Sequence, residues 1–350
     1  MTESLSTPAL VVDLDVFEAN VEAMSEMLHG TGKTVRPHFK THRTPELARR
    51  ELGGPIVGAT CATVGEAEAA VAAGIDDVLI ANEVVDPPKM ARIAQLARTA
   101  KVIVAADDAG PVAELSRAAR AAGVTVGVVV DVDVMLHRCG VPSAADAVAL
   151  ARVISASPGL RLAGVMGYEG RVRLTVEDRD AKLAAAYRTL GDAKAAIEAA
   201  GFPVEIVSGA GTSTVREALA DPHITEVQAG VFSLMEPELL VMDLPFRCAV
   251  AVRATVISRH PGRFVANAGR RVIGIDHGPP IPVGFAGAEV AMSDEHATVR
   301  IAGEPPALGS TVDFIPGQIR TTFNLHDRVW VSRGGEIVDC WPVTARGASQ

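Results

Sequence analysis

A lysine between two histidines ends the first predicted strand of the chain. The segment Thr34–Lys40 closes on Lys40, with His38 before it and His42 after it. Partial burial and cationic neighbours lower the pKa of a lysine, and the neutral amine then attacks carbonyl groups to form a Schiff base. An isolated lysine at such a place would be an ordinary surface residue. Polar groups at the other strand ends favour the chemical role.

The fifth and sixth predicted strands also end in polar groups. The fifth ends at Asp131 and leads into the block His-Arg-Cys-Gly, in which Arg138 could donate to an anionic oxygen such as the phenolate of a cofactor or form a salt bridge within the loop. Tyr168 follows the sixth strand, where it could pack on a ring, hydrogen-bond a phosphate or plug the rim. The residues alone leave these alternatives open.

A glycine-rich turn follows the seventh predicted strand and directly precedes a helix of sequence VREAL. Small residues let the backbone approach a phosphate, and the start of a helix offers free N–H groups and a positive dipole end. The loops after strands seven and eight often bind phosphate in barrel enzymes. The predicted cofactor contacts here are Ser208, Gly209, Gly211, Thr212, Gln228 and Gly230.

Eight predicted strands alternate with Ala-rich amphipathic stretches up to about residue 240. Such units match a (β/α)8 barrel better than an open sheet, which would need a Gly-rich fingerprint after its first strand. The predicted strands are Thr34–Lys40, Ile56–Thr60, Asp77–Ala81, Lys101–Ala105, Thr125–Asp131, Leu162–Gly167, Val204–Ser208 and Ile224–Gln228.

The pattern changes after residue 241 to short strand-like runs joined by Gly or Pro turns. We therefore expect an α/β protein with a barrel over residues 1–240 and a C-terminal antiparallel β-domain over residues 241–350. The first residues could instead pair with the β-domain. Within that domain, Arg333-Gly334-Gly335 predicts a hairpin turn.

The composition limits which binding partners and which cellular compartment we expect for the protein. The net charge of −9 disfavours a nucleic-acid or anionic-membrane surface, since both need clustered Lys and Arg. No apolar run is long enough to span a bilayer, and the first ten residues lack the layout of a signal peptide. The four cysteines are scattered without a CxxC pair. We expect a reduced, cytoplasmic protein that acts on a small molecule.

Several blocks together resemble the D-threonine aldolase and D-serine dehydratase family, which are fold-type III pyridoxal-phosphate (PLP) enzymes related to alanine racemase. They are the opening TPALVVDLD and the blocks RPHFKTHR, HRCGV, GYEG, SGAGT and EVQAG, with SDEH, NLHD and DCWPV further on. The resemblance implies that Lys40 binds PLP as an internal aldimine, Arg138 contacts the phenolic oxygen and Tyr168 lies beside the cofactor. It also implies a homodimer whose active sites lie between one subunit's barrel and the partner's β-domain.

One stretch departs from the family pattern. Members usually carry a metal-binding Pro-x-His-x-Cys or Pro-x-His-x-Asp before the NLHD block, whereas here Gln318 and Arg320 hold the two ligand positions. Glutamine is a poor ligand for zinc or manganese, and a guanidinium cannot be one. We therefore predict that the divalent metal is absent and that Arg320 supplies the positive charge near the reacting oxygen. Arg320 cannot readily act as a base.

Loss of the metal pair leaves proton transfer to other side chains. If the substrate hydroxyl must lose a proton, His38, His42 or His326 is the best acceptor by its ordinary pKa. The predicted catalytic residues are thus Lys40, His38, His42, Gln318 and Arg320.

The leading hypothesis is a PLP-dependent lyase that acts on a D-β-hydroxy-α-amino acid. We favour aldol cleavage over dehydration, because expelling hydroxide usually needs a stronger acid than Arg. One alternative is a racemase or epimerase that uses the same cofactor and two bases. Others are a non-catalytic PLP-binding protein, which is typically a lone barrel, and a sugar- or phosphate-handling barrel without PLP.

Overall fold

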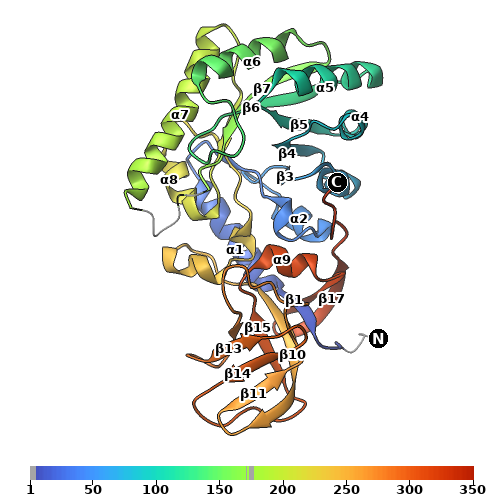
Figure 1. Cartoon of the computed structure of the whole chain (residues 1–350), viewed down its shortest axis with the longest axis vertical. Coiled ribbons are helices and arrows are strands. Elements are labelled where there is room, and N and C mark those ends of the chain that lie inside the picture. The colour runs from blue at the N-terminus through green and yellow to red at the C-terminus, as the bar shows by residue number, and fades with distance from the viewer. Residues whose placement is uncertain (1–4, 171, 173–176) are drawn as a thin grey trace. The chain divides into compact units, whose positions relative to one another are not determined.

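The computed structural model of the chain, which describes residues 5–170, 172 and 177–350, divides into two compact units (Figure 1). The β unit comprises the described residues up to Met24, then Thr41–Arg50 and Val231–Gly347. The barrel unit comprises Ser25–Lys40, Glu51–Gly230 and Ala348–Gln350. The main division thus lies at residue 231, where the sequence pattern placed it near 240, and two N-terminal segments belong to the β unit.

Eight parallel strands form the sheet of the barrel unit, in the order β2-β9-β8-β7-β6-β5-β4-β3. Two isolated parallel bridges, Val35 to Ile56 and His38 to Thr60, join the two ends of this order and close the ring. The predicted eight-stranded barrel is therefore confirmed. Its strands are β2 (Thr34–Val35), β3 (Ala59–Cys61), β4 (Asp77–Glu83), β5 (Lys101–Ala106), β6 (Val126–Asp131), β7 (Leu160–Gly167), β8 (Ile206–Gly209) and β9 (Glu226–Val227).

The first barrel strand is shorter than the predicted Thr34–Lys40. Regular pairing ends at Val35, because Pro37 has no N–H to donate to a ladder. The backbone nevertheless follows β9 a little further, since the His38 N–H donates to the Ala229 carbonyl at 3.1 Å. Phe39–Thr41 then form a 3-10 turn, so Lys40 lies just beyond the ring of strands.

Amphipathic helices follow the barrel strands. In α6 the buried residues Ala147, Leu150, Ala151 and Ile154 recur at helical spacing, so one stripe of the helix is buried. The helices of the barrel unit are α3 (Val64–Ala72), α4 (Pro87–Leu96), α5 (Ala109–Ala122), α6 (Ala144–Ala156), α7 (Arg179–Ala199), α8 (Val215–Ala220) and the 3-10 turn η2 (Thr212–Thr214). Among the described residues, no helix combines the length and apolarity needed to cross a membrane.

The β unit is built on a sheet of order β13-β14-β11-β10-β1-β16-β17, with β12 and β15 joined to it through β10. Its pairs are antiparallel except for β1 with β16, so the expected antiparallel domain is mostly antiparallel. The strands are β1 (Ala9–Asp13), β10 (Val250–His260), β11 (Arg263–Ala266), β12 (Ile281–Pro282), β13 (Glu289–Met292), β14 (Ala297–Arg300), β15 (Thr311–Ile315), β16 (Arg328–Arg333) and β17 (Glu336–Pro342).

The predicted hairpin turn joins β16 and β17. Gly334 and Gly335 have φ of 58° and 84°, the left-handed values that a two-residue hairpin turn requires. The remaining elements of the chain are α1 (Leu14–Leu28), α2 (Pro45–Glu51), α9 (Ile319–Asn324) and the 3-10 turns η1 (Phe39–Thr41), η3 (Val231–Ser233) and η4 (Pro237–Met242).

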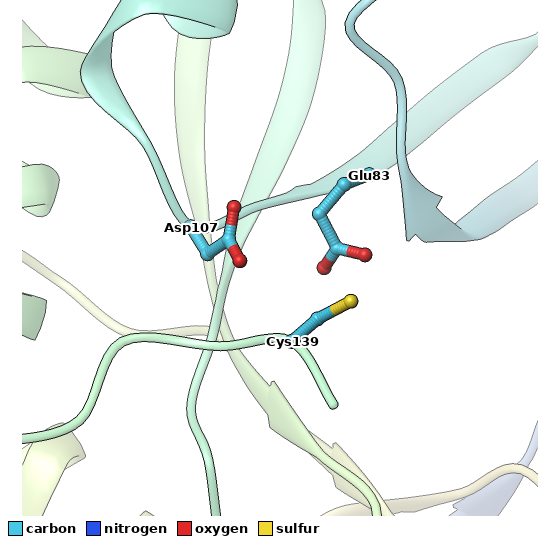
Figure 2. Close-up of side chains that lie close together, drawn as sticks. All are labelled: Glu83, Asp107 and Cys139. Atoms are coloured by element: carbon cyan, nitrogen blue, oxygen red, sulfur yellow. The ribbon is translucent and has the colours of Figure 1, made fainter. Parts of the chain in front are cut away.

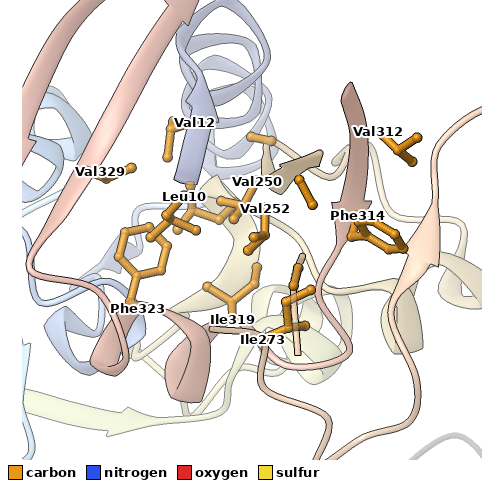
Figure 3. Close-up of a cluster of buried hydrophobic side chains, with 14 of the residues drawn as sticks. Leu10, Val12, Val250, Val252, Ile273, Val312, Phe314, Ile319, Phe323 and Val329 are labelled. Atoms are coloured by element: carbon orange, nitrogen blue, oxygen red, sulfur yellow. The ribbon is translucent and has the colours of Figure 1, made fainter. Parts of the chain in front are cut away.

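An apolar core fills the β unit (Figure 3). Alternate residues of β10, among them Val250 and Val252, point into it, as do Leu10 of β1 and Phe314 of β15. Phe323 joins the same core from α9. Alternation at a period of two is what a strand with one buried face requires, and it explains how this run reads as β structure.

A buried ion-pair network ties the barrel strands together. Arg36 donates from Nε to Glu226 Oε2 at 3.0 Å and from Nη1 to Asp77 Oδ1 at 2.6 Å. The side chains of Arg36 and Glu226 are each only 3% exposed, and Ser208 Oγ donates to the other Glu226 oxygen at 2.8 Å. Burial opposes ionisation of Asp77, but the Arg36 guanidinium lowers the pKa of that carboxyl below its usual value.

Removing Arg36 should destabilise the barrel unit strongly. In an Arg36→Met variant the buried Glu226 carboxylate loses its cation, and we expect the free energy of unfolding to fall by about 3–5 kcal/mol. Lys194→Met serves as the control, because Lys194 pairs with Glu198 on the open surface of α7 and its loss should cost under about 0.5 kcal/mol. Urea unfolding of both variants is the measurement. Equal losses would contradict this account of the network.

Candidate active site

The carboxyl ends of the barrel strands carry the predicted cofactor residues. Lys40 is half-buried in the 3-10 turn after β2, and His38 is 8% exposed. Because the His38 N–H bonds to Ala229 and the Gln228 N–H to Gly209, the ends of β2, β9 and β8 lie next to one another. A barrel enzyme builds its site at this end. The structure therefore brings the lysine motif and the glycine-rich turn to the same rim.

Ser208, one of the predicted phosphate ligands, is fully buried. Its hydroxyl donates to Glu226 Oε1 and accepts from Gln228 Nε2 at 3.0 Å. Gly209 has a packing role, since a Cβ there would lie 2.8 Å from the Gly167 carbonyl oxygen of the neighbouring strand. The side chains of Ser208 and Gln228 are thus engaged within the protein, which the sequence pattern did not reveal.

Tyr168, Gly211 and Thr212 lie together at the glycine-rich turn. A Cβ added to Gly211 would be 3.7 Å from Cε2 of Tyr168, so the half-exposed tyrosine ring lies against the turn. The Oγ1 atom of Thr212 is enclosed and has no hydrogen-bond partner among the described residues. An enclosed hydroxyl without a partner costs free energy unless a ligand or water completes it. This orphaned donor fits a phosphate oxygen.

Glu169 anchors the glycine-rich turn through Thr214. Thr214 Oγ1 donates to Glu169 Oε1 at 2.6 Å, and the Gly211 N–H donates to Thr214 Oγ1 at 3.0 Å. Glu169 is 1% exposed, and burial raises the pKa of its carboxyl although the hydrogen bond from Thr214 opposes the rise. Sequence reasoning missed this role, and the position of Glu169 directly after Tyr168 was the available signal.

A second polar cluster lies at the carboxyl ends of β4, β5 and β6 (Figure 2). Glu83 ends β4, Asp107 follows β5 and Cys139 lies in the loop after β6, and one ligand atom from each lies within 4.8 Å of the others. Asp131 at the end of β6 is 5% exposed, and burial together with Glu83 raises the pKa of its carboxyl to about 8. Sequence reasoning did not assign this cluster, although the rule of barrel strand ends selects each carboxylate.

Arg138 and Cys139 share the loop after β6. Arg138 is exposed and acts electrostatically on Asp131, so its guanidinium stands near the acidic cluster while remaining open to a ligand. Burial, with Glu83 nearby, raises the pKa of the Cys139 thiol to about 11. The thiol is therefore protonated at neutral pH and is a weak nucleophile.

In the β unit, Gln318 and Arg320 flank the start of α9. Arg320 Nη2 lies 3.5 Å from Glu236 Oε2, and the side chain of Glu236 is 3% exposed. The other Glu236 oxygen accepts the Ile319 N–H at 3.1 Å. A buried carboxylate therefore holds the guanidinium that occupies the position of the second metal ligand.

His277, which sequence reasoning missed, completes this group. Its Nδ1 lies 2.8 Å from Glu238 Oε2 and 3.6 Å from Glu236 Oε2, and its Nε2 lies 3.2 Å from Gln318 Nε2. Imidazole nitrogens and carboxylates are ligands for divalent metals, so Glu236, Glu238 and His277 are a possible cation site. Arg320, only 3.5 Å from Glu236, competes with a cation for that carboxylate.

Two other predicted proton acceptors have structural contacts in the β unit. His42 is fully buried, accepts the Thr44 N–H at its Nδ1 and packs edge-on against Phe323 with ring centroids 6.3 Å apart. His326 Nε2 lies 2.8 Å from the Val272 carbonyl oxygen, so this nitrogen carries the proton. Burial lowers the pKa of His326, although the Val272 carbonyl opposes the shift.

Comparison with known proteins places this geometry in a family. Residues 12–236 match the alanine racemase N-terminal domain, and residues 249–332 match the putative serine dehydratase domain. The chain is 37% identical to the D-threonine aldolase of an Arthrobacter species, over 99% of this chain and 94% of that protein. It is 33% identical to the 3-hydroxy-D-aspartate aldolase of Paracoccus denitrificans, with the same coverage of both.

A solved structure gives the same result in three dimensions. The crystal structure of D-threonine aldolase from Filomicrobium marinum superimposes with a TM-score of 0.94 at 36% identity, covering 99% of this chain and 97% of that one. Both domains are thus shared over nearly the full length. The chain belongs to the D-threonine aldolase and D-serine dehydratase family of lyases, in which an alanine racemase-like barrel precedes a dehydratase-like β-domain.

Proposed function

We propose that the protein is a PLP-dependent lyase that cleaves a D-β-hydroxy-α-amino acid into a smaller amino acid and a carbonyl compound. The observation that carries the proposal is Lys40, a half-buried lysine just past the first strand of a closed barrel, at the same rim as a glycine-rich turn. Full-length similarity to two proteins named aldolases supports the reaction class. The free cysteines suit a reduced, cytoplasmic setting.

The rim residues fit the cofactor. Lys40 would hold PLP covalently, and Gly211 and Thr212 would receive its phosphate, where the enclosed Thr212 hydroxyl lacks a partner among the described residues. Tyr168 would cover the phosphate end, and Arg138 would face the phenolic oxygen. When bound, PLP supplies an electron sink for bond cleavage at the α-carbon.

The proton that aldol cleavage removes from the substrate hydroxyl needs an acceptor. His38 is the candidate on the cofactor rim, since its backbone is fixed to Ala229 beside the glycine-rich turn. His42 is packed against Phe323, and we therefore assign it a structural role rather than a contact with the substrate. We assign His38 to proton transfer and Lys40 to both cofactor binding and proton exchange at the α-carbon.

We further propose that turnover needs no divalent metal at the family's ligand pair. Glutamine and arginine stand at the two ligand positions, and Glu236 holds Arg320 in place through a 3.5 Å contact. A guanidinium can stabilise a developing oxyanion or a second carboxylate without a metal ion. Because a guanidinium is a weak acid, hydroxide is a poor leaving group here, which favours aldol cleavage over dehydration.

Replacing Lys40 tests the cofactor assignment. A Lys40→Ala variant should lose the visible absorbance of covalently held PLP and essentially all activity, because the covalent link is made by the Lys40 amine. Lys101→Ala is the matched control, since Lys101 starts β5 at the opposite end of a strand and is 52% exposed. Absorbance spectra and activity are measured for both. Covalent absorbance that persisted in Lys40→Ala would exclude the assignment.

Product analysis tests the reaction and its metal requirement. We expect EDTA-treated, PLP-loaded protein to convert a D-β-hydroxy-α-amino acid into glycine or another shortened amino acid plus a carbonyl product, as followed by proton NMR in D₂O. A 2-oxo acid would instead identify a dehydratase. Exchange of the α-proton with an intact carbon skeleton would identify a racemase. Activity that returned only on adding a divalent metal would refute metal independence.

Arg320→Ala should lower kcat while PLP remains bound, because the positive charge near the reacting oxygen is lost. A loss of two to three powers of ten is expected, the size seen when one oxyanion donor is removed. Arg271→Ala is the control, because Arg271 is 70% exposed and pairs with the exposed Glu295. Unchanged turnover in Arg320→Ala would remove Arg320 from the site.

The proposed homodimer can be tested by mixing the Lys40→Ala and Arg320→Ala variants. If Arg320 completes the site of the partner subunit, mixed dimers of Lys40→Ala with Arg320→Ala contain one intact site. We expect the mixture to recover activity after subunit exchange, well above the small residual activity of either variant alone. A mixture that stays inactive while exchange is demonstrated would place both residues in sites of the same subunit.

A further inference from the structure

Metal-binding side chains also converge in the barrel unit, at the cluster of Glu83, Asp107 and Cys139, which the proposed reaction does not use. Figure 2 shows the two carboxylates and the thiol directed toward one another from separate segments of chain. One atom from each lies within 4.8 Å of the other two. A tetrahedral zinc ion with bonds of about 2.0–2.3 Å separates its ligands by roughly 3.3–3.8 Å, so small side-chain rotations suffice.

The carboxyl groups of the cluster have room for a further partner. The Oε1 atom of Glu83 is enclosed and accepts no hydrogen bond from the described residues. Asp131, whose side chain is directed at Glu83, is 5% exposed and adds a third carboxyl group. In the described part of the chain no Lys, Arg or His forms an ion pair with these carboxylates, although Arg138 acts electrostatically on both Asp131 and Cys139. Asp131 is buried and Glu83 and Asp107 are half-buried. Carboxylates gathered in such a place are costly unless a proton or a metal compensates their charge.

Hydrogen bonds to Asp133 brace the loop that carries Cys139. Asp133 Oδ1 accepts the N–H groups of Met135 at 3.0 Å and His137 at 2.9 Å. Met135 has φ of 126°, a value that residues with side chains rarely adopt, so the loop stores strain of the kind that gathers at functional sites. The thiol therefore reaches the cluster on a preorganised loop.

Gly140, next to Cys139, closes this loop onto the neighbouring strand end. Its φ is 101°, and a Cβ there would lie 2.5 Å from the Asp133 nitrogen. Its N–H donates to Asp107 Oδ2 at 3.0 Å, which orients that carboxylate and leaves Oδ1 available. Only glycine allows this approach, so the backbone places the thiol and the carboxylate of Asp107 beside each other.

We propose that Glu83, Asp107 and Cys139 bind one Zn²⁺ ion, with water or Asp131 as the fourth ligand. A thiolate with carboxylates suits zinc, whereas magnesium, calcium and manganese prefer oxygen donors alone. Binding forms a Zn–S bond and releases the thiol proton to solvent, with no change of oxidation state. The ion ties the ends of β4 and β5 to the loop that bears Arg138, so it acts as a clamp on that loop rather than as a participant in bond cleavage.

X-ray absorption at the zinc edge tests the site directly. The PLP-loaded protein is treated with chelator, given one equivalent of Zn²⁺ per chain and freed of unbound metal. We expect one sulfur neighbour at about 2.3 Å plus oxygen neighbours at about 2.0–2.2 Å. The other possible cation site, Glu236 with Glu238 and His277, contains no sulfur and cannot produce this signal. A spectrum without sulfur would overturn the proposal.

Matched variants assign the ligands. Cys139→Ala should abolish the sulfur signal, whereas Cys248→Ala should preserve it, because Cys248 lies in the other unit. Glu83→Gln and Asp107→Asn keep side-chain shape, and each should weaken zinc binding at least about tenfold in calorimetric titration. Sulfur coordination that survived Cys139→Ala, or affinity unchanged in both carboxylate variants, would refute the site. These readouts do not depend on aldolase activity, so failure of the proposed function leaves them intact.

Discussion

The barrel depends on a buried charge pair where its first strand in the chain pairs with its last. The first and last strands, β2 and β9, are only two residues long, so few backbone hydrogen bonds join them. Arg36 and Glu226, side by side across this seam, supply a charge-assisted contact in a setting that water does not reach. In such surroundings a charge pair is strong while both partners are present and costly when one is removed. Asp77 and Ser208 extend the same network to β4 and β8.

This network also decides which rim residues remain available for a ligand. Ser208 and Gln228 satisfy Glu226 and each other, so their side chains serve the barrel. Thr212, four residues after Ser208, keeps an enclosed hydroxyl without a partner in the described chain. The glycine-rich turn therefore divides into a half engaged within the barrel and a half that we propose receives the phosphate. Glu169 holds the second half through Thr214.

Two acidic groups in the molecule differ in how their charge is balanced. In the β unit, the buried Glu236 carboxylate has a guanidinium, an imidazole and a backbone N–H within reach. In the barrel unit, Glu83, Asp107 and Asp131 lie close together with a thiol, and the described residues provide no ion-pair partner. At the Glu236 group, the protein's own Arg320 thus supplies the positive charge. At the second group, a proton or a bound ion must supply the positive charge, since neighbouring carboxylates around the buried Asp131 repel one another when all are ionised.

The sequence by itself determined the barrel, its eight strands, the mostly β second unit and Lys40 as the chemically distinctive lysine. Hydrophobic periodicity and turn residues are local signals, and the lysine motif is contiguous. All of them can therefore be recognised in short stretches of sequence. Its weakest point was local as well, because Pro37 shortened the first strand. The alternative that the first residues pair with the β-domain is the one the structure shows, since β1 pairs with β10 and β16. Tertiary structure alone decided the partners of Ser208, the contact of Glu236 with Arg320, and the convergence of Glu83, Asp107 and Cys139. These residues are far apart in the chain, and the ring closure that brings strand ends together is a property of the whole sheet rather than of any segment.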